Sequence, residues 1–174
     1  MAQVEALNAI GYSQISETNT EGALIQIKPH KPSSAPRRGA NTDKTQIFVE
    51  FDEVIDDGGS QIISYSLEMD DGTGFISVSG EAGEDLTRTR QVTQDIVSGQ
   101  SFDFRYRAQN IFGWSEYSDV VTIIASSVPS QPLNVATTNN ESTTTVTISW
   151  DIPNESGGDG ILIDAYLIQI YDYS

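Results

Sequence analysis

The chain has 174 residues, of which 37% are hydrophobic and 20% charged, and these proportions are typical of an ordered globular protein of one to two domains. The formal net charge of −16 disfavours nucleic-acid binding, and the absence of Cys excludes a disulfide framework and thiolate metal sites. No run of about eighteen apolar residues is present that could cross a bilayer, so no membrane span is predicted in this segment.

Residues 1–27 are predicted to be the last two strands of a preceding domain. The stretch from Glu5 to Ser16 has its alanine, asparagine, glycine and two serines at the same spacing as the stretch from Arg107 to Ser118. A stretch that recurs in this way indicates a second copy of the same structural unit.

Residues 28–35 are predicted to be a basic, proline-rich linker, because no acidic residue falls between Glu21 and Asp43. We expect its basic side chains, with those that follow it, to contact a neighbouring domain or another subunit, since complementary charge fixes the register of an interface. A solvated hinge is the alternative. The candidate contact residues are Lys28, Lys31, Arg37 and Arg38.

Residues 36–127 are predicted to form one complete β-sandwich, because apolar and polar residues alternate in several short stretches. The expected inward residues are Ile47, Val49 and Phe51, then Tyr65, Leu67 and Met69, and then Phe102, Phe104, Tyr106 and Ala108. Between them we expect a turn at Asp70–Gly74 and strands at Phe75–Ser79 and Leu86–Asp95. The last strand, within 120–124, is apolar on both faces, so its register stays open.

Residues 128–174 are predicted to be the first three strands of a following domain. The string from Thr45 to Asp52 recurs from Thr144 to Asp151, about 100 residues later, and a Gly-Gly pair and a tyrosine follow it in both places. The repeat distance is the length of one domain.

In this order the motifs resemble a fibronectin type III domain. The similar features are Pro129 and Pro132, the Trp-Asp-Ile-Pro step at 150–153, the Gly-Gly pair with its later tyrosine, and the stretch 102–115, which is similar to the family's Tyr-x-Phe-Arg-Val-Arg-Ala-x-Asn-x-x-Gly-x-Ser. The resemblance implies an all-β fold of immunoglobulin-like β-sandwich modules in tandem, with one complete module between two partial ones.

Two positions depart from the family pattern. Phe51 stands in place of the tryptophan of the second strand, which keeps an aromatic core residue. Phe102 stands where many sandwiches place the tyrosine-corner tyrosine, so the bond from its hydroxyl is missing. We therefore expect the loop Ile96–Ser101 to be held by packing alone.

No catalytic residue, cofactor or metal site is predicted. The single histidine, His30, lies in the linker without a rigid neighbour to orient it as a general base. Acidic loops such as Asp56–Gly59, Asp70–Gly72 and Glu81–Asp85 concentrate carboxylates, but none has the spacing of a calcium loop, and ordered calcium binding stays the minor alternative. Arg38-Gly39-Ala40 lacks the carboxylate of an adhesive Arg-Gly-Asp motif.

Asn140 and Asn154 begin N-glycosylation sequons, which permit a secretory location. We predict a non-enzymatic structural or adhesive segment of a long tandem-repeat protein, extracellular or at the cell surface, with any signal sequence upstream. The expected partners are neighbouring modules of the same protein, with self-association into oligomers or filaments. The alternatives are spacer modules of a secreted carbohydrate-active enzyme and an intracellular cytoskeletal or ciliary scaffold. The two partial modules either continue into further modules or complete each other between subunits by strand exchange.

Overall fold

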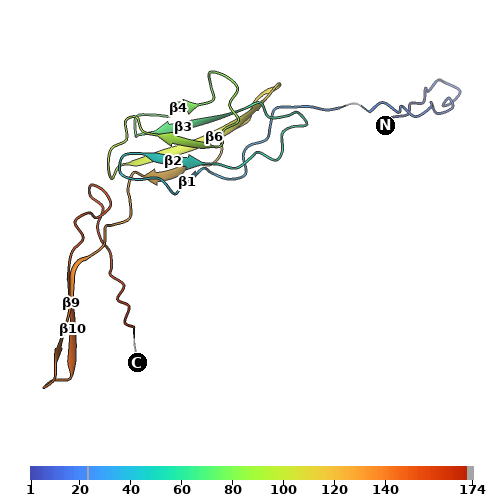
Figure 1. Cartoon of the computed structure of the whole chain (residues 1–174). Coiled ribbons are helices and arrows are strands. Elements are labelled where there is room, and N and C mark those ends of the chain that lie inside the picture. Colours follow the sequence, from blue (N-terminus) through green and yellow to red (C-terminus); the bar gives the residue numbers. More distant parts are fainter. Residues whose placement is uncertain (23, 172–174) are drawn as a thin grey trace.

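The computed structural model describes residues 1–22 and 24–171, and every regular element in this part of the chain is a β-strand. Eight strands form a central sandwich of two antiparallel sheets (Figure 1). One sheet has the order β1 (Arg37–Arg38), β2 (Ile47–Glu50), β5 (Thr89–Val92). The other has the order β4 (Ile76–Ser79), β3 (Ser64–Asp70), β6 (Ser101–Asn110), β7 (Gly113–Trp114), and β8 (Val121–Ile124) also pairs with β6. The all-β, immunoglobulin-like fold predicted from the sequence is confirmed.

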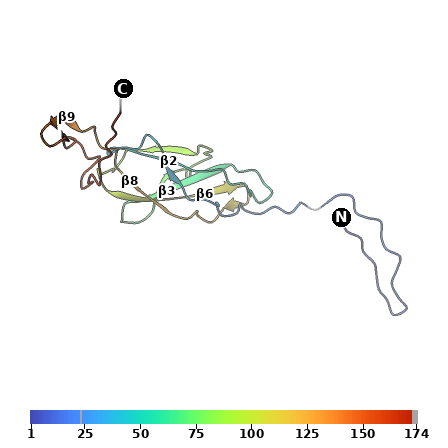
Figure 2. The ribbon, with the colours of Figure 1, turned by 90° about the horizontal axis from the view of Figure 1, so that it is seen from below.

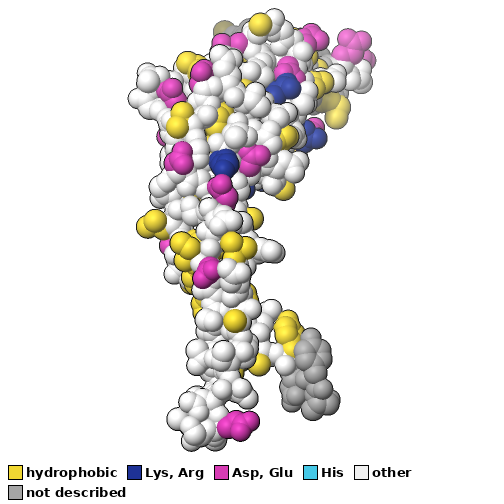
Figure 3. Space-filling model, turned by 60° about the vertical axis from the view of Figure 1, so that its left-hand side comes forward, with side chains coloured by type: hydrophobic (Ala, Val, Ile, Leu, Met, Phe, Trp, Pro, Cys, Tyr) yellow, Lys and Arg dark blue, Asp and Glu magenta, His cyan; other side chains and the backbone are white. Residues whose placement is uncertain are grey.

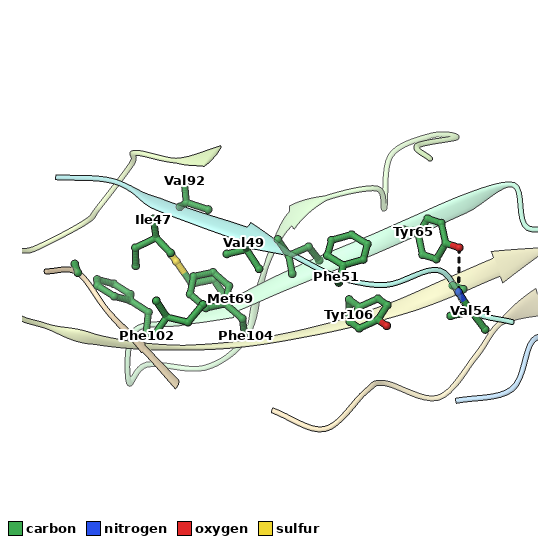
Figure 4. Close-up of a cluster of buried hydrophobic side chains, with 14 residues drawn as sticks. Ile47, Val49, Phe51, Val54, Tyr65, Met69, Val92, Phe102, Phe104 and Tyr106 are labelled. Atoms are coloured by element: carbon green, nitrogen blue, oxygen red, sulfur yellow. Dashed lines mark hydrogen bonds between the residues drawn. The ribbon is translucent and has the colours of Figure 1, made fainter. Parts of the chain in front are cut away.

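The core lies between these two sheets and is the one that the alternation predicted. Every residue expected to point inward from β2, β3 and β6 is buried, and their side chains meet in Figure 4. Phe51 stacks on Tyr106 with ring centroids 4.5 Å apart and lies 5.7 Å from the ring of Tyr65, so the phenylalanine serves as the aromatic core residue. The open register of β8 is settled by Ile123, which is 2% exposed, whereas Ile124 faces solvent.

The strand predicted from Leu86 to Asp95 is shorter in the structure, because its first residues cross from one sheet to the other. The carbonyl of Asp85 accepts a hydrogen bond from Tyr65 N–H of β3, whereas the carbonyl of Arg88 accepts one from Phe51 N–H, just after β2. Regular pairing with β2 begins only after this crossing, at β5.

The expectation that the loop Ile96–Ser101 is held by packing alone is wrong. Gly99 N–H donates to the carbonyl of Ala125 at 2.8 Å, and Ala125 N–H donates to the carbonyl of Gln100 at 3.0 Å. The side-chain amide of Gln100 also donates to the carbonyl of Asp71 at 3.1 Å. Backbone hydrogen bonds and the side chain of Gln100 therefore hold this loop, whereas a tyrosine hydroxyl supplies the bond in a tyrosine corner.

An arm extends from each end of the sandwich (Figures 1 and 2). The N-terminal arm folds back on itself as the N-terminal hairpin (residues 2–19), with one bridge between Leu7 and Tyr12 in place of the two regular strands expected there. The C-terminal arm carries the hairpin of β9 (Leu133–Asn140) and β10 (Thr145–Asp151).

The third strand expected in the C-terminal arm is not regular in the described residues 163–171. In the sandwich the corresponding strand, β3, pairs with β6 along its length, whereas no described strand pairs with residues 163–171. Residue 23 and residues 172–174, which the sequence analysis assigned to the two partial domains, lie outside the described part of the chain.

Candidate interface between repeats

The repeat in the sequence is also a repeat of hydrogen bonds. In the sandwich, Ser115 N–H donates to Ala108 O at 2.8 Å, and Ser115 Oγ accepts from Ala108 N–H at 3.1 Å. In the N-terminal hairpin, Ser13 and Ala6 exchange the same two bonds, at 2.8 and 3.0 Å. The second serine of each motif does likewise: Ser118 bonds Tyr106, and Ser16 bonds Val4. The N-terminal hairpin therefore has the local structure of the hairpin that follows β6.

Asn110 joins three segments at one end of the sandwich. Its Nδ2 donates to the carbonyl oxygens of Ile27 at 2.7 Å and Asp57 at 2.8 Å, and its Oδ1 accepts from Phe112 N–H. The side chain thus links its own hairpin to the first connector (residues 24–36) and to the first loop (residues 52–63), which lies between β2 and β3. Asn110 is 1% exposed, and its burial is tolerated because both polar atoms of its side-chain amide are hydrogen-bonded.

The first connector also pairs with the first loop through its backbone. Ile27 N–H donates to Gly58 O at 2.9 Å, and His30 N–H donates to Asp56 O at 3.0 Å. Gly58 has φ +72°, and a Cβ there would lie 2.4 Å from Ile27 O, so only glycine permits this approach.

The same pairing recurs between the second connector (residues 125–132) and the second loop (residues 152–162), which follows β10. Ser127 N–H donates to Gly157 O at 2.7 Å, and Ser130 N–H donates to Glu155 O at 3.0 Å. Gly157 also has positive φ, and a Cβ there would lie 2.2 Å from Ser127 O. Two equivalent connectors therefore meet two equivalent loops in the same way.

Side chains add further contacts between the sandwich and the second loop. Lys44 Nζ lies 2.9 Å from Glu155 Oε2, and this hydrogen bond raises the pKa of Lys44. Asp159 N–H donates to Ser98 Oγ at 3.0 Å. Gly99 packs so closely that a Cβ on it would lie 1.9 Å from Asp159 O. The contacts come from two separate parts of the sandwich, the turn before β2 and the loop before β6.

The sequence reasoning did not name Lys44, Ser98 or Asp159 as candidate residues. The available signal for the second loop was its Gly-Gly pair, which repeats that of the first loop. A lysine or serine in a turn has no pattern of its own, so its partner emerges only from the fold.

Two of the predicted contact residues, Lys28 and Lys31, attach the first connector to the sandwich. Lys28 Nζ lies 3.0 Å from Glu116 Oε1, and Lys31 Nζ lies 2.6 Å from Asp119 Oδ1. The hydrogen bond from Lys28 lowers the pKa of Glu116. Both acidic partners follow β7, so the pair of bonds crosses from the connector to the segment that leads into β8.

The other two, Arg37 and Arg38, lie on β1. Arg37 Nη1 lies 2.7 Å from Asp52 Oδ1, and this bond, together with one from Ser34, lowers the pKa of Asp52. Arg38 Nη2 donates to the carbonyl of Ser126 at 2.5 Å, which fastens the start of the second connector to the sandwich.

The outer face of β6 carries a ladder of arginine and aromatic side chains. Arg105 lies over the rings of Phe75 and Tyr117, at 3.8 and 4.0 Å from their centroids. Arg107 lies over Tyr117 and Trp114, at 4.5 and 4.7 Å. Each guanidinium is therefore held between two rings by cation–π attraction.

Glu68 of β3 completes this ladder. Its carboxylate lies 2.7 Å from Arg105 and accepts a hydrogen bond from the hydroxyl of Tyr117. Burial and the bond to Glu68 raise the pKa of Tyr117 to about 12. The ladder fastens the segment after β7 to the face of the sheet, and its charges are paired within the sandwich.

The carboxylates of the acidic loops cap their own turns. Asp70 Oδ1 accepts from the N–H groups of Gly72 and Gly74. Asp71 Oδ1 accepts from the hydroxyl and the N–H of Thr73, and these two bonds lower the pKa of Asp71. No group of three or more His, Cys, Asp or Glu side chains is placed to hold a metal ion within residues 1–22 and 24–171. His30 is exposed and lies 3.7 Å from Asp56.

Both sequon asparagines are exposed. Asn140 ends β9, and its Oδ1 accepts from the N–H and the hydroxyl of Ser142. Asn154 lies on the second loop beside Glu155.

The C-terminal arm exposes the face that forms the core in the sandwich. Trp150 and Tyr166 lie with centroids 5.3 Å apart at 56°, much as Phe51 and Tyr65 lie at 5.7 Å and 59°. Their apolar neighbours are on the surface, among them Val146 at 66% exposed, and Figure 3 shows apolar side chains along this arm.

No described helix is long and apolar enough to cross a membrane.

Comparison with known proteins agrees with the sandwich. No family model matches the chain. Titin of Drosophila melanogaster is 28% identical over 92% of this chain, and human fibronectin type-III domain-containing protein 3A is 24% identical over 86% of it. The chain spans only 1% and 12% of the length of these relatives.

Similar solved structures include the sixth fibronectin type III domain of human fibronectin type III domain containing protein 3, with a TM-score of 0.48 at 16% identity over 67% of this chain and 99% of that domain. Domains A168–A170 of titin give a TM-score of 0.46 at 20% identity, over 57% of this chain and 32% of that one.

The fold defines an all-β protein of immunoglobulin-like sandwiches. The sequence relatives support the resemblance to fibronectin type III modules that the sequence motifs carry.

Proposed function

We propose that this chain is a structural, non-catalytic segment of a long array in which fibronectin type III modules follow one another at a fixed orientation. The complete module is 36–127, and 1–27 and 128–174 are parts of its neighbours. The observation that carries the proposal is the duplicated pairing of connector and loop: Ile27 with Gly58, and Ser127 with Gly157. A connector that is hydrogen-bonded to the loop of the following module is held in place, whereas a flexible linker lacks such bonds.

Side chains support the fixed orientation. The bonds Lys44 to Glu155 and Asp159 to Ser98 lie to the side of the backbone connection. If only the backbone joined two modules, they could rotate about the connector. Side-chain contacts beside the connector oppose that rotation. Because the charged pair is exposed, it defines the register of the junction more than its strength.

The partners that the contacts support are neighbouring modules of the same protein. The contacts described at the second connector join the sandwich to the loop of the repeat that follows it. Assembly into oligomers or filaments is the extension of this proposal.

The extracellular or cell-surface location is part of the same proposal. The exposure of Asn140 and Asn154 on a hairpin end and a loop supports it, because glycans are attached at accessible sites. Mass spectrometry of the native protein tests it. Glycan on either asparagine is the expected result, and both asparagines bare in native material would count against secretion.

The orientation is tested by residual dipolar couplings of the full chain. Couplings from the sandwich and from the second loop should fit one alignment tensor, and Lys44→Glu should separate them. Lys31→Glu is the matched control, because it removes the bond of the first connector to Asp119 and touches no residue of the second loop. Independent tensors in the unaltered chain would overturn the proposal.

A further inference from the structure

The first and second loops occupy equivalent places in successive repeats, but only the second is docked on its lateral side. In the second loop, Glu155 and Asp159 bond Lys44 and Ser98 of the module before it. In the first loop the same sequence places hold Asp56 and Ser60, on either side of the Gly-Gly pair. The Asp56 side chain is 66% exposed; its Oδ1 accepts from Gly58 N–H of the same turn at 3.2 Å, and its Oδ2 lies 3.7 Å from His30.

The backbone around the two loops shows that this equivalence is structural. His30 N–H donates to the carbonyl of Asp56, just as Ser130 N–H donates to that of Glu155. Gly58 approaches the first connector as Gly157 approaches the second. The backbone of Asp56 therefore lies against its connector as that of Glu155 does.

Charge at the two ends of the module is complementary. The end that carries the first loop has Asp56 and Asp57, and the opposite end has Lys44, which bonds the acidic Glu155 of the second loop. An acidic loop at one end and a basic turn at the other allow successive modules to join head to tail, in a heterologous contact that repeats along the array.

We propose that the first loop, at Asp56 and Ser60, is a docking site for the opposite end of another fibronectin type III module. That module carries a lysine or arginine in the turn before its second strand, to bond Asp56. It carries a small hydroxyl residue in the loop before its sixth strand, to accept from Ser60 N–H. This inference rests on the proposed array and adds the chemistry of the junction ahead of the complete module.

A duplicated module tests the site within the full chain. Residues 28–127 are repeated so that Ser127 of the first copy is followed by Lys28 of the second, which keeps the register of the repeat. The first copy then presents its own Lys44 and Ser98 to the first loop of the second copy. Because the chain has no Cys, introduced cysteines report contact without a background.

The reporter pair is Ser98→Cys in the first copy with Ser60→Cys in the second. The positive control is Ser98→Cys in the second copy with Asp159→Cys, the contact seen in the structure. For the negative control, Thr73→Cys replaces Ser98→Cys, since Thr73 is exposed on a turn at the same end of the module but not at this loop.

The reporter disulfide should form at a rate similar to the positive control and well above the negative one. Asp56→Lys in the second copy should slow it by about two- to fivefold, as expected for an exposed ion pair, and Lys44→Glu in the first copy should restore it. This inference is overturned if the reporter disulfide forms no faster than the negative control while the positive control forms rapidly. That result leaves the proposed array standing. If the positive control also fails, the proposed array fails with it.

Discussion

The side chain of Asn110 donates a hydrogen bond of 2.7 Å to the carbonyl of Ile27, 83 residues earlier in the chain. Because Asn110 ends β6, which carries more core residues than any other strand, this bond ties the connector directly to the core of the module. The corresponding residue of the N-terminal hairpin, Asn8, bonds only its own turn and is exposed.

Asn110→Ala should lower the free energy of unfolding of the sandwich by about 1–3 kcal/mol, because the carbonyls of Ile27 and Asp57 lose their donor at a buried site. Asn8→Ala is the matched control and should change it by less than about 0.5 kcal/mol, as for other surface substitutions. Urea unfolding followed by circular dichroism measures both. Equal effects of the two substitutions would contradict the role assigned to Asn110.

Gly58→Ala should destabilise the module more than Gly72→Ala. Both glycines have positive φ, so both variants strain the backbone, but only at Gly58 would the new Cβ meet a carbonyl, that of Ile27. The added overlap should cost about 1–3 kcal/mol beyond the Gly72 variant. The difference in urea midpoint between the two variants measures the effect of the contact with the Ile27 carbonyl apart from the backbone strain. Equal midpoints would mean that the connector moves away from the new Cβ at no cost.

Tyr117 should titrate at high pH, because its pKa is raised to about 12. Its pKa of about 12 reflects burial and the bond to Glu68, both of which oppose ionisation. A phenol whose pKa is raised in the folded state stabilises the module below pH 10, and this contribution is lost as the pH rises toward 12. Absorbance at 295 nm should therefore show a late step that Tyr117→Phe removes. A late step that persists in that variant would assign it to another tyrosine.

The sequence predicts the core of this fold well and the contacts between its repeats poorly. Alternation alone identifies Phe104 and Leu67 as inward, because a strand with period two has one buried face. Alternation also identifies Arg105 as outward. It does not predict that the guanidinium lies between the rings of Phe75 and Tyr117, because that contact joins three separate segments. The same limit applies to Lys44, whose partner is 111 residues away.

The charged contact between the first connector and the segment after β7 should be released at low pH. The bond from Lys28 holds the pKa of Glu116 below its ordinary value of 4.5, so the attachment is fully present above that pH and is lost as the pH falls through the lowered pKa. Hydrogen exchange or NMR shifts of the Lys28 and His30 amides, followed from pH 6 to pH 2, should show the release. In Glu116→Gln the amides should show the released state already at pH 6, because the neutral amide cannot form the ion pair. If the unaltered chain and this variant share one pH profile, then the backbone bond from His30 to Asp56, and not the charged pair, holds the connector in place.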